Sequence, residues 1–215
     1  MIYAILIPCH ARFTVVAILL WCLLFMLTAC SNSPQPSRIT DQNIDMIEKS
    51  VLPGDIILRK GHGLVSNFIA VNYGGKHKMS HCGIVTKTEG KLLVIHCISG
   101  QIARHDGVLK EPLKDFVSLN STAQLKLFSI RNQTTEGQQK LTASAERYAS
   151  LTIPFDHNFD LSDTNSMFCI ELITCCMQKA YKNCMEDTDI KNKHFAGFEL
   201  FDDTSLFVEK IIREK

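Results

Sequence analysis

Two neighbouring runs of branched apolar residues constrain the fold of this chain more than any other feature. Residues 80–86 read Ser-His-Cys-Gly-Ile-Val-Thr, residues 91–97 read Lys-Leu-Leu-Val-Ile-His-Cys, and Glu89-Gly90 lies in the short connection between them. Valine and isoleucine favour strands, and a short connection with a glycine between two such runs is typical of a β-hairpin. The sequence therefore predicts an antiparallel sheet built around this hairpin.

The length of the hairpin loop determines where two histidines point. A two-residue loop at Glu89-Gly90 would pair Gly83 with His96. His81 and His96 would then stand diagonally on one face of the sheet, because side chains alternate along a strand and directly opposed residues share a face. A three-residue loop would place the two histidines on opposite faces.

Residues 165–181 contain a cysteine in a helical pattern. Asn165 or Ser166 is expected to serve as the N-cap, and apolar residues recur at steps of three and four: Phe168, Leu172, Ile173, Cys176 and Ala180. Cys169 would fall in the first turn, where free backbone N–H groups and the positive end of the helix dipole favour a thiolate. The simpler interpretation is a buried cysteine that only packs, since free cysteines are among the most often buried residues.

The amino-terminal part resembles the signal peptide of a bacterial lipoprotein. Residues 13–29 form an apolar run that ends in Leu-Thr-Ala-Cys, which is similar to a lipobox with Cys30 as the lipid-bearing residue. We therefore expect a signal peptide at 1–29, a lipidated Cys30 with a polar linker at 30–40, and one domain at 41–215. This implies a lipid-anchored protein of the cell envelope, expected at the outer membrane because Ser31 follows the cysteine. A plain transmembrane anchor is the alternative, although the run is only marginally long enough.

Composition narrows the class of partner. The 215 residues are 46% hydrophobic and 21% charged, an ordinary composition for a compact domain. Removing residues 1–29 takes away only one charged side chain, Arg12, and leaves 22 basic and 22 acidic residues. A nucleic-acid-binding protein would carry a basic excess, so nucleic acid is not an expected partner.

Further strands and helices are predicted on both sides of the hairpin. Strands are expected at 56–58, at 100–109 together with a turn, and at 124–130, and helices near 41–51, 64–71, 113–119 and 134–151. This mixture predicts an α+β fold. No close pair of histidines or cysteines with metal-ligand spacing accompanies the hairpin, so no metal or other cofactor is predicted. A zinc site that adds Cys169 to the two histidines is the alternative.

Taken in order, these segments resemble a known family. Pro-Gly-Asp-Ile-Ile at 53–57, Ser-His-Cys-Gly-Ile-Val at 80–85, Pro-Phe-Asp at 154–156 and Phe-Cys-Ile-Glu-Leu at 168–172 are similar to the YiiX-like, circularly permuted branch of the NlpC-type papain-like cysteine peptidases and amidases. The resemblance implies a permuted papain-like fold, in which an antiparallel sheet packs against the helix that carries the nucleophile. It covers roughly residues 52–181.

The resemblance also implies roles for three residues. Cys169 would be the nucleophile, His81 the base, and His96 the residue that orients the base, a position that is often glutamate in YiiX-like members. Ile170 and Phe168 stand where relatives commonly have serine and tyrosine. The implied activity is hydrolysis of an amide bond, in cell-wall peptides, through an acyl-enzyme formed on the cysteine.

Two other functions remain open. The permuted scaffold also serves lipid acyltransferases, so an acyl ester or lipid amide is an alternative substrate class, and the peptide or acyl group to be cleaved is the expected partner beside the membrane. A lipoprotein that keeps the fold only to bind a partner is the second alternative. It would be favoured if replacing Cys169 by alanine changed nothing.

Several other residues in these segments have structural interpretations. Asp55 follows a Pro-Gly turn and is expected to cap it, Glu171 could bond to the backbone or contact the pocket, and Asp156 could line the site. The register that unites the histidines places Cys82 opposite Cys97 on the other face. Two buried free thiols are favoured there over a disulfide, although the expected compartment is oxidising.

Overall fold

The computed structural model describes residues 41–118, 122–161, 165–181 and 197–212. The expected signal peptide at 1–29 and the expected lipidated Cys30 with its linker lie outside these residues. Within the part that is described, no helix is both long enough and apolar enough to cross a lipid bilayer.

The described domain is built on one six-stranded antiparallel sheet with the strand order β4-β3-β2-β1-β5-β6. Its strands are β1 (Ile56–Lys60), β2 (His81–Thr88), β3 (Lys91–Ile98), β4 (Gly107–Pro112), β5 (Gln124–Ile130) and β6 (Phe207–Lys210). The helices are α2 (Asp41–Ser50), α3 (Gly63–Asn72), α4 (Leu113–Phe116), α5 (Thr135–Ser150), α6 (Cys169–Ala180) and the 3₁₀ helix η2 (Phe198–Asp202). The predicted α+β class and antiparallel sheet are confirmed.

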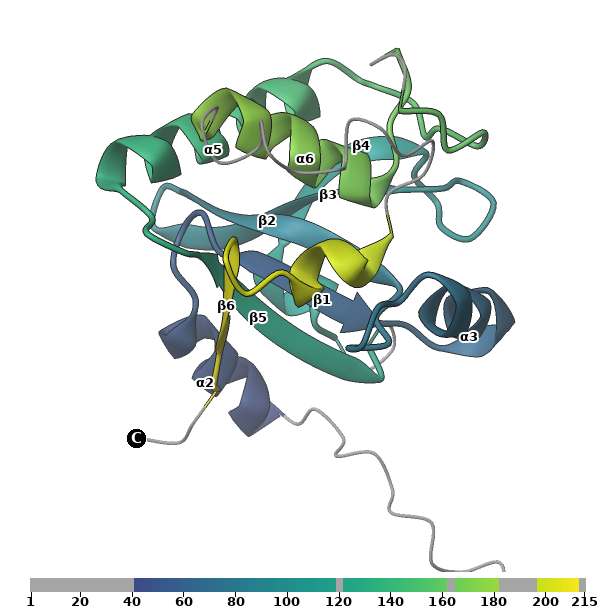
Figure 1. Ribbon diagram of the computed structural model, residues 1–215, viewed down its shortest axis with the longest axis horizontal. Helices are drawn as coiled ribbons and strands as arrows, with labels where there is room; N and C mark the ends of the chain where they lie inside the picture. Colours follow the sequence, from purple (N-terminus) through teal and green to yellow (C-terminus); the bar gives the residue numbers. More distant parts are fainter. Residues whose placement is uncertain (1–40, 119–121, 162–164, 182–196, 213–215) are drawn as a thin grey trace, which may run out of the picture. The chain divides into compact units, whose positions relative to one another are not determined.

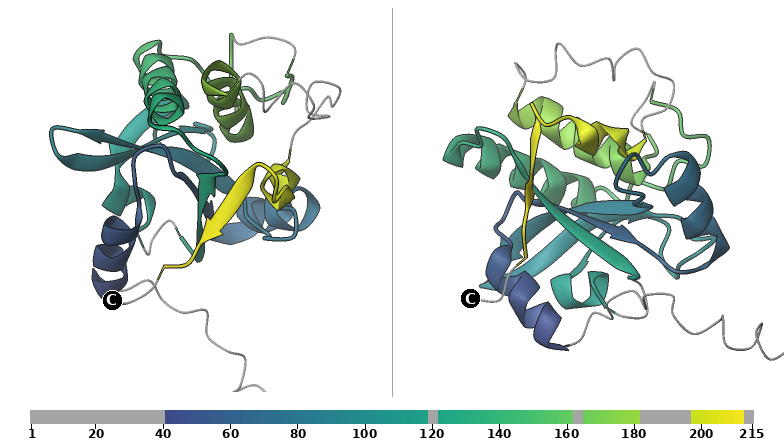
Figure 2. Two further views of the ribbon diagram at one scale, coloured as in Figure 1. Left: turned by 60° about the vertical axis from the view of Figure 1, so that its left-hand side comes forward. Right: turned by 60° about the horizontal axis from the view of Figure 1, so that its bottom comes forward.

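The sheet separates two hydrophobic cores. Helices α5 and α6 lie side by side over one face, and α2 lies on the other side of the sheet (Figures 1 and 2). Alternate residues of each strand serve the two cores: Cys82 and Ile84 of β2 pack under α6, whereas Val85 packs with α2 and α4. By the same alternation, His81 points to the face that carries α4.

The hairpin has the predicted register. Gly83 pairs with His96, and the loop consists of Glu89 and Gly90, whose φ angles of 51° and 80° are those of a tight hairpin turn. Because the loop has two residues, His81 and His96 share one face of the sheet, and the three-residue alternative is wrong.

The predicted strand at 100–109 begins too early. Residues 99–106 form a loop that is closed when the Oδ1 atom of Asp106 accepts a hydrogen bond from the N–H of Gly100 at 2.6 Å. Strand β4 starts only at Gly107 and continues to Pro112. The predicted helix at 113–119 is likewise shorter in the structure, and strand β6 was not predicted, since its four residues are too few to show a period.

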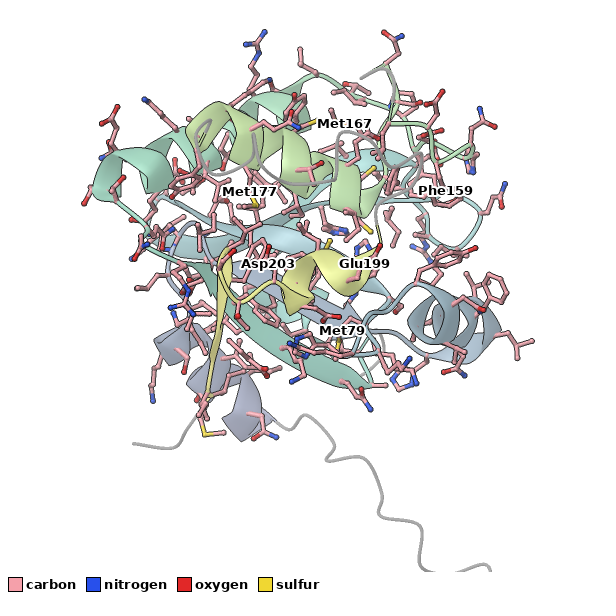
Figure 3. All side chains as sticks on the ribbon, in the orientation of Figure 1. Met79, Phe159, Met167, Met177, Glu199 and Asp203 are labelled. Carbon is pink, nitrogen blue, oxygen red and sulfur yellow. The ribbon has the colours of Figure 1, made fainter. Side chains whose placement is uncertain are left out.

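Helix α6 starts later than the sequence pattern predicts. Its N-cap is Phe168, with extended backbone, rather than Asn165 or Ser166. The side chain of Phe168 is buried in the core, which holds the chain extended up to that point, and Cys169 becomes the first helical residue. The predicted placement of Cys169 in the first turn is therefore confirmed. Further along the same helix, Met177 points into the space between α6 and the sheet (Figure 3).

Candidate active site

Cys169 begins α6 with its thiol surrounded by hydrogen-bond donors. The pKa of this thiol is lowered first by a hydrogen bond from the Cys82 thiol and further by the backbone N–H groups of Cys82, Ile170 and Cys169, and together these causes outweigh burial, which raises the pKa. The residue as a whole is half-buried, and the lowered pKa raises the thiolate fraction above that of an ordinary cysteine.

His81 and His96 are in direct contact on the face of β2 and β3 that packs against Phe116. The Nε2 atom of His81 lies 2.8 Å from the Nδ1 atom of His96, with the rings nearly perpendicular. Burial, and then the neighbouring charges of Arg59 and His96, lower the pKa of His81 well below the usual histidine value. The resting imidazole of His81 is therefore neutral, and its Nδ1 atom is the ring nitrogen that this contact does not use.

Glu111 of β4 extends the row of histidines by one residue. Its Oε1 atom lies 2.9 Å from Nε2 of the buried His96. The two atoms are close but are not aligned as a hydrogen bond, so Nε2 of His96 has a carboxylate oxygen beside it without bonding to it. Sequence reasoning missed Glu111 because it assigned 111 to the gap between a strand and a helix; an acidic residue on the strand next to His96 was the available signal.

An aromatic ring contacts both histidines, and a buried cation packs on that ring. The Phe116 ring stacks on His81, with ring centres 5.7 Å apart, and contacts His96 edge-on at 5.1 Å. The Arg59 guanidinium lies 4.3 Å from the same ring and donates to the Phe116 carbonyl at 2.6 Å. Burial lowers the pKa of Arg59, and the negative charges of Glu111 and Cys169 oppose that change. Arg59 therefore remains a cation that interacts electrostatically with both Glu111 and Cys169.

The structure brings the two histidines together and brings Cys169 to the same end of β2. The thiol approaches from the α6 side and meets the N–H of Cys82, the residue directly after His81. Among the contacts of the described residues, none joins the sulfur to the His81 ring directly. Cys169 and His81 thus both adjoin Cys82, the first through its sulfur and the second along the chain.

A cavity of about 630 Å³ opens beside the histidines. His81, His96 and Glu111 form part of its wall, together with residues of α3 and of the loop between β3 and β4. Apolar side chains make up much of the remaining wall: Leu64, Val65, Ile69, Ile98, Ile102 and Leu109. Cys169 is not among the residues that line this cavity within the described part of the chain.

Asp55 has the structural role that the turn predicts. One carboxylate oxygen accepts the N–H of Leu52 at 2.7 Å, and the other accepts the Ser129 hydroxyl at 2.7 Å. Lys210 of β6 adds an ion pair at 2.6 Å. The fully buried carboxylate joins the turn before β1 to β5 and β6, and it lies away from the cavity wall.

Two acidic residues near the nucleophile bond to the backbone. The Oε2 atom of Glu171 accepts the N–H of Phe168 at 3.4 Å, which caps the start of α6. The Asp156 carboxylate accepts the N–H groups of Asn158 and Asp160 at 2.8 and 2.6 Å and organises the loop before the helix. Backbone bonding thus accounts for Glu171, and Asp156 does not line the cavity.

The cysteines of the sheet are free thiols. Cys82 and Cys97 are both buried and form no disulfide, as the favoured alternative predicted. The described residues also contain no group of three His, Cys, Asp or Glu side chains arranged to hold a metal ion. Cys169 with both histidines, the zinc alternative, is not among such groups in the described part of the chain.

Comparisons with known proteins identify the family and the fold of this chain. Residues 50–198 match the family described as permuted papain-like amidase enzyme, YaeF/YiiX, C92 family. The fold is similar to the crystal structure of the metalloprotein YiiX from Escherichia coli O157:H7, with a TM-score of 0.58 and 18% identity, over 76% of this chain and 98% of that one. A search of curated proteins found no match. The chain thus belongs to the YaeF/YiiX family of permuted papain-like amidases, a family of cysteine-peptidase-type hydrolases.

Proposed function

We propose that the chain is a cysteine amidase in which Cys169 is the nucleophile, His81 the general base and His96 the residue that orients the base. The observation that carries the proposal is the position of the Cys169 thiol. It lies at the start of a helix and receives the N–H of Cys82, one residue after a histidine that is itself held by a second histidine at 2.8 Å. A cysteine that only packs would have no need of these donors.

The reaction begins with transfer of the thiol proton of Cys169 to Nδ1 of His81. The thiolate attacks the carbonyl carbon of the substrate, and the backbone N–H groups at the start of α6 stabilise the oxyanion that forms. The His81 imidazolium then protonates the leaving amine, and water hydrolyses the thioester through the same imidazole. Nδ1 of His96 accepts a hydrogen bond from the Nε2–H group of His81 and holds the His81 ring in place throughout the reaction.

The substrate and location belong to the same proposal. The amide cleaved is that of a cell-wall peptide, and a lipid on Cys30 holds the domain at the envelope, on the outer membrane. The family description as an amidase supports the bond type. The lipobox-like end of the apolar run supports the anchor.

A lipid or acyl-ester substrate is the second candidate, and one observation favours it. The cavity beside His81 and His96 has mainly apolar walls, and Leu64 and Ile102 on its rim are 89% and 60% exposed. An acyl chain would bury this surface, whereas a polar cell-wall peptide would leave it in water.

Alkylation of the thiols tests the proposed nucleophile. The full chain in mild detergent is treated with iodoacetamide at mildly acidic pH, and each cysteine is quantified by mass spectrometry. We expect Cys169 to react fastest, and His81→Ala to lose hydrolysis of a panel of amide and ester substrates by a factor of about 10² to 10⁴. His157→Ala, an exposed histidine away from the cavity, is the matched control.

The result that would overturn the proposal is equally specific. If Cys169 reacts no faster than the buried thiols, and Cys169→Ala leaves the hydrolysis of every substrate unchanged, the thiol is not a nucleophile. The chain would then be a binding protein that retains the fold of an enzyme family.

A further inference from the structure

Three side chains from three neighbouring strands form one continuous row. His81 of β2 contacts His96 of β3, and His96 contacts Glu111 of β4, at 2.8 and 2.9 Å. His81 contributes one nitrogen, Nε2, whereas His96 contributes both of its nitrogens, Nδ1 to His81 and Nε2 to the carboxylate. The ring nitrogen of His81 that takes no part in these contacts is Nδ1.

We infer that Glu111 is a positioning residue that fixes the tautomers of both histidines, so that Nδ1 of His81 carries a lone pair able to take the proton of Cys169. This inference rests on the proposed function for its consequence, but the tautomers themselves can be measured without any activity.

The charge of Glu111 acts on the tautomer of His96. An ionised carboxylate carries only lone pairs, so at 2.9 Å it attracts a ring N–H and repels a ring lone pair, which favours the proton of His96 on Nε2. A neutral imidazole carries one N–H, so Nδ1 of His96 is then an acceptor. The proton between the rings therefore belongs to Nε2 of His81, and Nδ1 of His81 is left without one.

The opposite arrangement would disable the base. If His96 carried its proton on Nδ1, it would donate to Nε2 of His81, and the single proton of His81 would lie on Nδ1. That nitrogen would then have no lone pair to offer the thiol. Both arrangements give the same distance between Nε2 of His81 and Nδ1 of His96. The charge of Glu111, at the other end of the row, therefore determines which arrangement forms.

The surroundings keep Glu111 ionised. Burial raises the pKa of this carboxyl, but the hydrogen bond and charge of His96 and the charge of Arg59 outweigh burial and lower the pKa overall. The other titratable groups that line the same cavity are His62, Arg104, His105 and Asp115. The buried guanidinium of Arg59 is the cation that favours the ionised form of Glu111.

Nitrogen NMR of the histidine rings tests the inference. The full chain is labelled with ¹⁵N-histidine, solubilised in detergent, and studied at pH 8 in a Cys169→Ala background, so that the thiol cannot transfer its proton to the ring. We expect both His81 and His96 to be protonated at Nε2 only. In Glu111→Gln the amide can either donate or accept, so the Nε2-protonated share of both rings should fall to roughly half.

A matched carboxylate outside the row provides the control. Glu146 pairs with Lys110 of the same strand at 2.8 Å on the surface, and Glu146→Gln should leave both tautomers unchanged. Protonation of His81 at Nδ1 in the unsubstituted row would overturn the inference, even if Glu111→Gln failed to fold. Unchanged tautomers in a folded Glu111→Gln would also overturn it. Alkylation of Cys169 decides the proposed function separately, so the two can fail independently.

Discussion

The Cys82 thiol donates a hydrogen bond to the sulfur of Cys169, which joins the first residues of β2 to the first residue of α6. Burial raises the pKa of Cys82, and this hydrogen bond raises it further, while the same bond lowers the pKa of Cys169. The hydrogen bond therefore shifts the two thiols in opposite directions, favouring the neutral thiol of Cys82 and the thiolate of Cys169.

Removing the donor should slow the reaction of Cys169 with iodoacetamide. A neutral hydrogen bond contributes about 1 kcal/mol, so Cys82→Ala should slow alkylation below the pKa of Cys169 by roughly fivefold. Cys82→Ser retains a donor of similar size and should stay closer to the unsubstituted rate. Equal rates in the alanine and serine variants would show that the thiol hydrogen bond does not activate Cys169.

The pH dependence of alkylation should separate the cysteines. Because the pKa of Cys169 is lowered, its thiolate fraction at mildly acidic pH exceeds that of an ordinary cysteine, and its rate should rise with pH and level off at a lower pH. Burial raises the pKa of Cys175 to about 11, and raises those of Cys97 and Cys176 further. These three should react only in alkali. A profile for Cys169 that overlaps that of Cys175 would contradict the assignment.

Gly83 allows His96 to lie close to β2, and adding one methyl group should disturb the row. A Cβ atom at Gly83 would lie 2.5 Å from the Cγ1 atom of Val94 and 3.1 Å from the Cβ atom of His96. We expect Gly83→Ala to cost about 1–3 kcal/mol in the free energy of unfolding and to shift the ring signals of both histidines. Denaturant unfolding and histidine NMR measure the two effects.

Gly90 of the hairpin loop is the control for that substitution. Its φ of 80° makes alanine strained, but no atom lies within 4 Å of the added Cβ. Gly90→Ala should therefore destabilise the chain by about 1 kcal/mol without moving the histidine signals. If Gly83→Ala also leaves those signals in place, close packing at Gly83 does not position His96.

The Asp55 carboxylate should contribute to stability rather than to activity. Asp55→Ala leaves the Ser129 hydroxyl and the N–H of Leu52 without their acceptor, and we expect a loss of about 3 kcal/mol in unfolding free energy. Glu209→Ala removes the exposed ion pair with Lys126 and should cost less than about 1 kcal/mol. An Asp55→Ala chain as stable as the Glu209→Ala chain would contradict this role.

Local patterns in the sequence predicted the central part of the site. The Glu89-Gly90 loop sets the register of β2 on β3, and strand alternation then places His81 and His96 on one face. Helical spacing placed Cys169 in a first turn, although the buried Phe168 rather than a polar residue precedes the helix. Such features depend on neighbours a few residues away, which is why periodicity and turn chemistry reveal them.

The sequence by itself determined the hairpin register and the helical position of Cys169, because both follow from the short-range geometry of the backbone. Only the tertiary structure decided that Glu111 meets His96 and that the N–H of Cys82 meets the sulfur of Cys169. The first contact depends on how β4 pairs with β3 after the loop at 99–106, and the second on which face of the sheet α6 covers. Both contacts form between segments that are distant in the chain. They therefore depend on the packing of the whole core and cannot be predicted from a local pattern.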